Sequence, residues 1–167
     1  MAARVSVQSA DFDLGVEVAA MRARDTGVGA VAAFIGTVRD RNDGRGVSAM
    51  ELEHYPGMTE RAIEAMIDAA MLRFELRGAR VVHRIGRLQP QDQIMMVAVT
   101  AAHRGPAFQA CEFLMDYLKT QAPFWKKEQT PDGERWVDAR VSDDAALARW
   151  GLCAANAVVP VGGEPEP

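Results

Sequence analysis

The sequence predicts an α+β fold, in which a mainly antiparallel or mixed sheet is covered by packed helices. Helix-like and strand-like segments are mixed along the 167 residues, and most strand-like segments lie in neighbouring pairs joined by short turns. The hydrophobic fraction of 49% is enough for one buried core. We therefore expect residues 1–150 to form a single domain and residues 151–167, which are rich in proline and glycine, to form a mobile tail.

The first third of the chain predicts a short helix followed by two strands. Residues 13–24 have apolar side chains at helical spacing. Residues 28–38 are apolar on both alternate faces, which predicts a strand buried on both sides. A polar, glycine-containing loop at 39–45 leads to residues 47–55, where apolar and charged side chains alternate as in a strand with one wet face.

The middle of the chain predicts an amphipathic helix and a strand pair. Apolar residues recur at steps of three and four over 60–76, with Thr59 as the N-cap and Gly78 ending the helix. Residues 79–88 and 92–100 predict two strands separated by a proline-containing turn. The second of these strands is apolar enough to be a central strand.

The last third predicts one long helix and a second hairpin. The helix begins at Gly105-Pro106, because proline is favoured at the first helical position, and runs to about Thr120. Phe108 and Leu118 belong to its apolar stripe, and Pro123 ends it. Two short strands and a final helical turn or two follow, at 124–129, 135–137 and 142–150.

Composition excludes several classes of protein. The chain has 19 basic and 23 acidic residues, a net charge of −4, which argues against a nucleic-acid or anionic-membrane binder. Its two cysteines and three scattered histidines show no metal-ligand spacing, so we expect no metal and no cofactor. Neither a signal-peptide pattern nor an apolar run of about 20 residues is present, which predicts a cytoplasmic protein.

Cations concentrate at the ends of three predicted elements, where an anion would bind. These segments are Gly36–Arg39, His103-Arg104, and Lys119 with Lys126-Lys127. The second is the strongest, because a helix start offers free N–H groups and an arginine can grip two oxygens. Each segment also has a structural explanation, since a lysine in a last helical turn complements the dipole and a lysine pair can cover a solvated strand.

The spacing of two of these cations carries a further consequence. Arg104 and Lys119 lie 15 positions apart along one predicted helix, or about 22 Å. One small substrate could not touch both residues in the same chain. Either they serve different ligands, or a symmetric dimer brings the helix start of one chain to the helix end of the other.

At these residues the sequence closely resembles the MoaE family, the catalytic (large) subunits of molybdopterin synthase. The resemblance is collinear over roughly residues 28–150, except that Ala101 stands where a serine is expected and the segment after Trp150 has no counterpart. The matching stretches are AFIGTVRDRNDG (33–44), LEHYPGMTE (52–60), VVHRIGRLQPQD (81–92), VAVTAAHRGPAF (97–108), MDYLKTQAPFWKKE (115–128) and GERWVDA (133–139).

The resemblance implies an α/β-hammerhead-like fold and a specific reaction. The family converts cyclic pyranopterin monophosphate (precursor Z) to molybdopterin by installing two dithiolene sulfurs. Sulfur arrives as a thiocarboxylate on the C-terminal glycine of a small ubiquitin-like (MoaD-like) subunit ending in Gly-Gly. The implied assembly is a homodimer of large subunits within a heterotetramer.

The resemblance also implies which residues form the substrate pocket. Lys119 and Lys126 would be catalytic, with Lys119 orienting the thiocarboxylate and stabilising negative charge. Arg39, His103 and Arg104 would bind the substrate phosphate, the last two from the neighbouring chain. The full implied set is Thr37, Val38, Arg39, His103, Arg104, Lys119, Lys126, Lys127 and Glu128.

Two other functions are compatible with the same residues. One is a non-catalytic dimeric module that binds a ubiquitin-like tail or a phosphorylated metabolite. The other is a Schiff-base enzyme using Lys119, which is disfavoured because nothing in the sequence indicates a desolvated lysine pocket with a carbonyl substrate.

Overall fold

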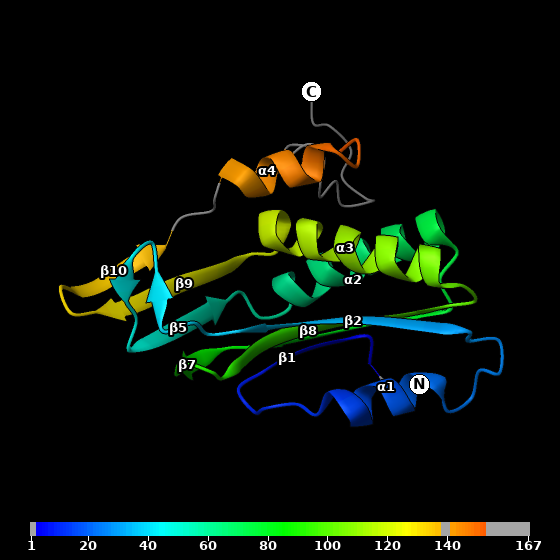
Figure 1. Ribbon diagram of the computed structural model, residues 1–167, viewed down its shortest axis with the longest axis horizontal. Coiled ribbons are helices and arrows are strands. Elements are labelled where there is room, and N and C mark those ends of the chain that lie inside the picture. The colour runs from blue at the N-terminus through cyan, green and yellow to red at the C-terminus, as the bar shows by residue number, and fades with distance from the viewer. Residues whose placement is uncertain (1–2, 138–140, 153–167) are drawn as a thin grey trace.

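The computed structural model describes residues 3–137 and 141–152, and it confirms the α+β prediction (Figure 1). Within this part of the chain, two four-stranded sheets and one two-stranded ribbon are packed with four helices. Every strand pair except one is antiparallel, as the hairpin-like sequence pattern predicts.

The first sheet has the strand order β1-β6-β8-β2. Its members are β1 (Val5–Gln8), β6 (Gly78–Arg84), β8 (Gln93–Ala101) and β2 (Ala30–Thr37). The β1–β6 pair is parallel, and β1 was not foreseen from the sequence pattern. β8 is buried from Met95 to Ala101, which confirms the predicted central strand.

Helices cover both faces of this sheet (Figure 1). The long helices α2 (Met58–Phe74) and α3 (Arg104–Gln121) lie on one face, and α1 (Leu14–Arg22) lies on the other. Alternate residues of β8 serve the two cores: Val97 packs toward α2 and α3, whereas Met96 packs toward α1. The last helix, α4 (Val141–Ala148), adds Leu147 to the larger core.

The second sheet has the order β10-β9-β5-β7, and its strand β9 follows directly after α3. It consists of β5 (Ala49–His54), β7 (Gly86–Leu88), β9 (Phe124–Thr130) and β10 (Gly133–Val137). Beside it, the predicted 39–45 loop contains a small hairpin of β3 (Arg41–Asn42) and β4 (Arg45–Gly46). Gly86, with φ 81°, divides the predicted strand 79–88 into β6 and β7.

Both predicted ends of the second helix are wrong. Gly57 is the N-cap, and its N–H donates to Glu60 Oε2 at 2.6 Å. Thr59 lies buried inside the helix and is not its N-cap. Its hydroxyl accepts a hydrogen bond from the Tyr55 N–H and donates one to the Pro123 carbonyl. The helix ends at Phe74, since Glu75 adopts a left-handed conformation with φ 50°, and Gly78 begins β6.

The predicted burial of residues 28–38 on both sides is also wrong for a single chain. β2 is an edge strand, and the side chains of Val31 and Phe34 are 36% and 42% exposed. Phe108, predicted on the apolar stripe of α3, is 66% exposed beside it. An apolar pattern predicts burial, but it does not identify which chain provides the covering surface.

Two remaining sequence expectations concern the membrane and the tail. None of the helices in the described ranges is both long and apolar enough to cross a membrane. Residues 153–167, most of the predicted mobile tail, lie outside the described residues.

Candidate active site

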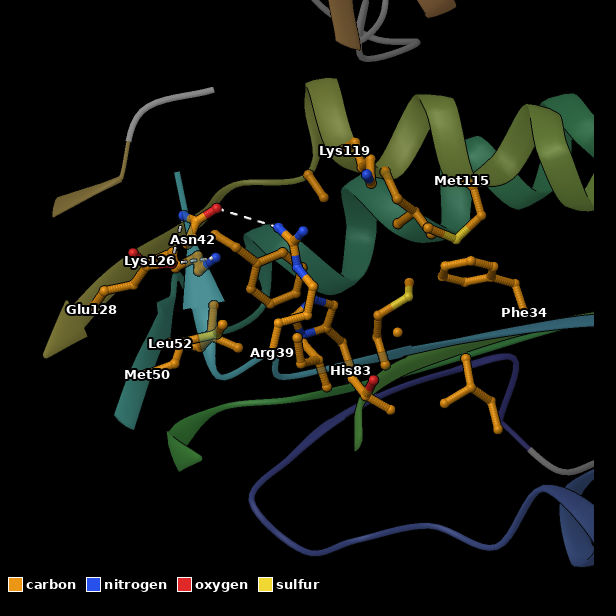
Figure 2. A pocket seen from close by; sticks show the side chains of 18 of the residues that line it. Phe34, Arg39, Asn42, Met50, Leu52, His83, Met115, Lys119, Lys126 and Glu128 are labelled. Carbon is orange, nitrogen blue, oxygen red and sulfur yellow. Dashed lines mark hydrogen bonds and ion pairs between the residues drawn. The ribbon is translucent and has the colours of Figure 1, made fainter. Parts of the chain in front are cut away.

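A cavity of about 670 Å³ lies where the two sheets meet the C-terminal end of α3 (Figure 2). It brings together five of the nine residues in the predicted set. These five come from the end of β2, the segment after it, the last turn of α3 and strand β9; they are Thr37, Arg39, Lys119, Lys126 and Glu128. Apolar side chains, among them Phe34 and Met115, complete the wall.

The backbone around Val38 explains how Arg39 reaches the cavity. The register of β2 against β8 shifts between Gly36 and Thr37, where the strand ends. Val38 then exchanges backbone hydrogen bonds with the following turn, accepting from Gln91 at 2.8 Å and donating to Asp92 at 2.9 Å. Its side chain is buried with Met50 and Leu88, so Val38 anchors the chain and does not line the cavity.

Lys119 is an exposed cation in the lining of the cavity, as is Arg41. It lies in the last turn of α3, with Met115 one turn earlier on the same wall. Within the described part of the chain, its ammonium group makes no hydrogen bond and no ion pair. An anion entering the cavity would therefore meet a charge that no acidic neighbour has neutralised.

Strand alternation divides the cations of β9 between two faces. Lys126 and Glu128 face the cavity, and Lys126 Nζ lies 2.8 Å from Glu128 Oε1. Lys127 lies on the other face, 3.2 Å from Glu134 Oε2 and 5.5 Å from the centre of the Trp136 ring. The structure therefore places Lys127 outside the cavity.

Glu128 is a buried carboxylate, only 1% exposed, held by three donors. Its Oε1 accepts from Lys126 and from Asn42 Nδ2 at 2.9 Å, and its Oε2 lies 3.4 Å from Arg135 Nη2. Burial raises the pKa of Glu128, but the hydrogen bonds from Lys126 and Asn42 outweigh burial and hold the pKa below its ordinary value. Glu128 thus stays ionised and fixes Lys126 in place.

Sequence reasoning missed Asn42, which lies between two of these groups. Its Oδ1 accepts from Arg39 Nη2 at 3.3 Å while its Nδ2 donates to Glu128. Asparagine in a polar, glycine-containing segment indicates a turn, so nothing local distinguishes Asn42 from its neighbours.

Sequence reasoning also missed His83, which lines the floor of the cavity (Figure 2). Its ring stacks on Phe124 with the centroids 3.7 Å apart, and Nδ1 donates to the Arg84 carbonyl at 2.8 Å. Burial lowers the pKa of His83 to about 4, so the imidazole is neutral near pH 7. The signal that could have found it is its place among apolar residues in a buried strand.

His103 and Arg104 lie at the opposite end of α3 from Lys119. His103 is the N-cap of the helix, Arg104 is its first residue, and both side chains are exposed. Neither lines the cavity of its own chain. The structure therefore agrees with the separation expected from their spacing.

The described residues form neither a metal site nor a nucleophilic cysteine site. No group of three or more metal-ligating side chains occurs among them. Cys111 is buried, and burial followed by the charge of Glu112 raises the pKa of its thiol to about 11, which leaves no nucleophilic thiolate near pH 7.

The α+β fold with a cation-lined cavity defines a class of proteins that bind small anionic ligands. Comparison with known proteins narrows this class. The family model described as MoaE protein matches residues 7–121. The chain is 66% identical to the molybdopterin synthase catalytic subunit of Ralstonia nicotianae, over 92% of this chain and 87% of that protein.

Solved structures of related proteins have the same fold as this chain. The MoaE protein of Burkholderia ambifaria is 63% identical, with a TM-score of 0.78 over 90% of this chain and 99% of that one. Molybdopterin synthase of Staphylococcus aureus is 28% identical, with a TM-score of 0.76 over 83% of this chain and 99% of that one. The chain belongs to the MoaE family. It is a sulfur-transferring enzyme of molybdenum cofactor biosynthesis.

Proposed function

We propose that this chain transfers sulfur from the C-terminal thiocarboxylate of a small ubiquitin-like subunit to precursor Z, giving the dithiolene of molybdopterin. The observation that carries the proposal is the cavity itself, which gathers four cations in a chain of net charge −4: Arg39, Arg41, Lys119 and Lys126. Both the phosphorylated substrate and the thiocarboxylate are anions, and both need cations to hold them. The name of the relatives, catalytic subunit, supports a second subunit as partner.

Three of these cations have different surroundings, which supports different roles. Lys119, whose ammonium group makes no ion pair in the described part of the chain, orients the thiocarboxylate and stabilises negative charge at its acyl carbon. Arg39 binds the phosphate. Lys126, already paired with Glu128, keeps a fixed position beside the pterin side chain or the incoming tail. Sulfur arrives activated, so the protein supplies placement and charge.

We further propose that the working site is completed by a second copy of the chain, which supplies His103 and Arg104. A hollow of about 530 Å³ between β2 and α3 ends at Lys119, and it is lined by Phe34 and Phe108. Covering the apolar part of this surface with a symmetric partner would bury β2 and bring the start of the partner's α3 toward Lys119. The resulting assembly is a homodimer with one small subunit at each end.

Two further proposals concern the extent of the domain and the compartment in which the protein acts. Residues 1–150 act as one domain, which is supported by the hydrogen bond of Trp150 Nε1 to Asp116 Oδ2 at 2.7 Å and by the burial of Leu147 in the main core. The enzyme acts in the cytoplasm, where reducing conditions keep thiols and thiocarboxylates intact.

The decisive experiment mixes the purified protein with a thiocarboxylated small subunit and precursor Z, and measures dithiolene formation. Lys119→Ala should lower turnover by about 100-fold or more while still binding the small subunit. Arg22→Ala, on an exposed turn of α1 across the sheet, is the matched control and should keep full turnover. Absence of product from the unmodified protein with verified thiocarboxylate would favour the non-catalytic binding module instead.

A further inference from the structure

Two buried polar residues in the cavity lining, Asn42 and Glu128, contact cavity cations (Figure 2). Glu128 is 1% exposed and Asn42 is 5% exposed, so water does not solvate either side chain freely. Asn42 Nδ2 donates to Glu128 Oε1 at 2.9 Å, and the same oxygen lies 2.8 Å from Lys126 Nζ. The carboxylate therefore binds one cavity cation and one neutral amide at a single atom.

The other end of the amide binds the second cavity cation. Asn42 Oδ1 accepts from Arg39 Nη2 at 3.3 Å. Arg39 is exposed and has a long side chain that would otherwise sample many rotamers. Through Asn42, Arg39 and Lys126 are connected by one continuous set of hydrogen bonds, although they come from segments more than 80 residues apart.

The chemistry of the link requires a carboxamide. Asn42 accepts from a guanidinium on one side and donates to a carboxylate on the other, and an amide has both functions in a fixed geometry. An ionised aspartate would have no proton to donate to Glu128, and an apolar side chain would have neither function. The hairpin of β3 and β4 holds Asn42 at this point between β9 and the segment after β2.

We propose that Asn42 is a positioning residue that couples Arg39 to the Glu128–Lys126 pair, so that the two cations meet an anionic substrate at a fixed spacing. The proposal rests on the proposed function for its activity test. The contribution of Asn42 is made through Arg39 and Lys126, and Asn42 does not itself react. A phosphate held by Arg39 in both the ground and the transition state lowers KM more than it raises kcat.

The test uses Asn42→Leu, which removes the hydrogen bonds to Arg39 and Glu128 and keeps the number and branching of the side-chain heavy atoms. KM for precursor Z should rise about tenfold, with kcat changed by less than about threefold. In an Arg39→Ala background, the same substitution should change KM by less than about twofold, because the coupled partner is already gone. An equal effect in both backgrounds, or an unchanged KM in the single variant, would overturn the proposal.

The matched control is Ser48→Ala, which removes the hydrogen bond from Ser48 Oγ to the Gln129 carbonyl at 3.3 Å. It loosens the same region against β9 without touching the cavity, and it should leave KM unchanged. Thermal unfolding of every variant identifies any that fail to fold, and Asn42→Ser replaces Asn42→Leu in that case, since the hydroxyl is too short to bridge both partners.

A second measurement separates this proposal from the proposed function. Calorimetric titration with inorganic phosphate needs no turnover. The affinity should fall about fivefold or more in Asn42→Leu and remain unchanged in Ser48→Ala. If the unmodified protein forms no dithiolene, the proposed function fails but the phosphate result still decides the role of Asn42, and equal affinities would refute it.

Discussion

At the scale of a single residue, the burial of His83 makes the free energy of unfolding depend on pH. Burial lowers the pKa of His83 from the ordinary 6.5 to about 4, although its hydrogen bond to the Arg84 carbonyl opposes the change. Between these two values the unfolded chain binds a proton that the folded chain does not. The free energy of unfolding should therefore fall as pH is lowered from 6.5 to 4, by about 3 kcal/mol in total.

Denaturant unfolding at several pH values measures this effect. His83→Gln keeps a donor for the Arg84 carbonyl and has no titrating group, so its stability should depend less steeply on pH in the same window. Equal slopes for the two proteins between pH 6.5 and 5 would show that His83 is not the group responsible.

Gly29 is a second residue whose identity affects stability, because the fold leaves no room for a Cβ atom at this position. A methyl group there would lie 2.2 Å from the carbonyl oxygen of Ala102, which directly precedes His103. Gly29→Ala should therefore displace the backbone at the start of α3 and lower the free energy of unfolding by about 2 kcal/mol. Gly46→Ala, where nothing lies within 4 Å, is the control and should unfold like the unmodified protein in the same denaturant titration.

At the scale of elements, the edge strand β2 and the helix α3 form the surface that we assign to the second copy. Val31 and Phe108 are exposed apolar side chains on these two elements. Val31→Glu with Phe108→Glu should give a folded monomer, because two charges cannot be buried unpaired at an apolar interface. Sedimentation analysis measures the mass, and circular dichroism checks the fold.

The control for this change is Leu72→Glu on α2, because Leu72 is 85% exposed and also apolar. It should leave the mass of the assembly unchanged. A dimeric mass for the double variant would place the interface elsewhere, and a monomeric mass for Leu72→Glu would show that any added charge disrupts association.

At the scale of the whole molecule, a composite site predicts complementation between two defective chains. Arg104→Ala and Lys119→Ala should each impair dithiolene formation as homodimers. When the two chains are mixed and reassembled at random, half of the dimers are mixed and each has one intact site, so about one quarter of full activity should return. No recovery would mean that Arg104 and Lys119 do not act in one site across two chains.

The elements themselves could be predicted because their signals are local. Apolar periodicity identified α2, α3 and the central strand β8, and the Pro-Asp-Gly turn identified the hairpin of β9 and β10. Helix ends were less predictable, since the Thr59 hydroxyl binds the Pro123 carbonyl from a distant part of the chain. A residue's local pattern does not include such partners.

The sequence by itself determined the α+β class, the order of the elements and, through collinear motifs, the family. Tertiary structure alone decided which cations share the cavity: Arg39, Arg41, Lys119 and Lys126 do, whereas Lys127 faces Glu134 on the opposite side of β9. It also revealed Asn42 as the link between Arg39 and Glu128. The physical reason is that secondary structure follows from neighbours in the chain, whereas a buried hydrogen-bond network depends on groups brought together only by folding.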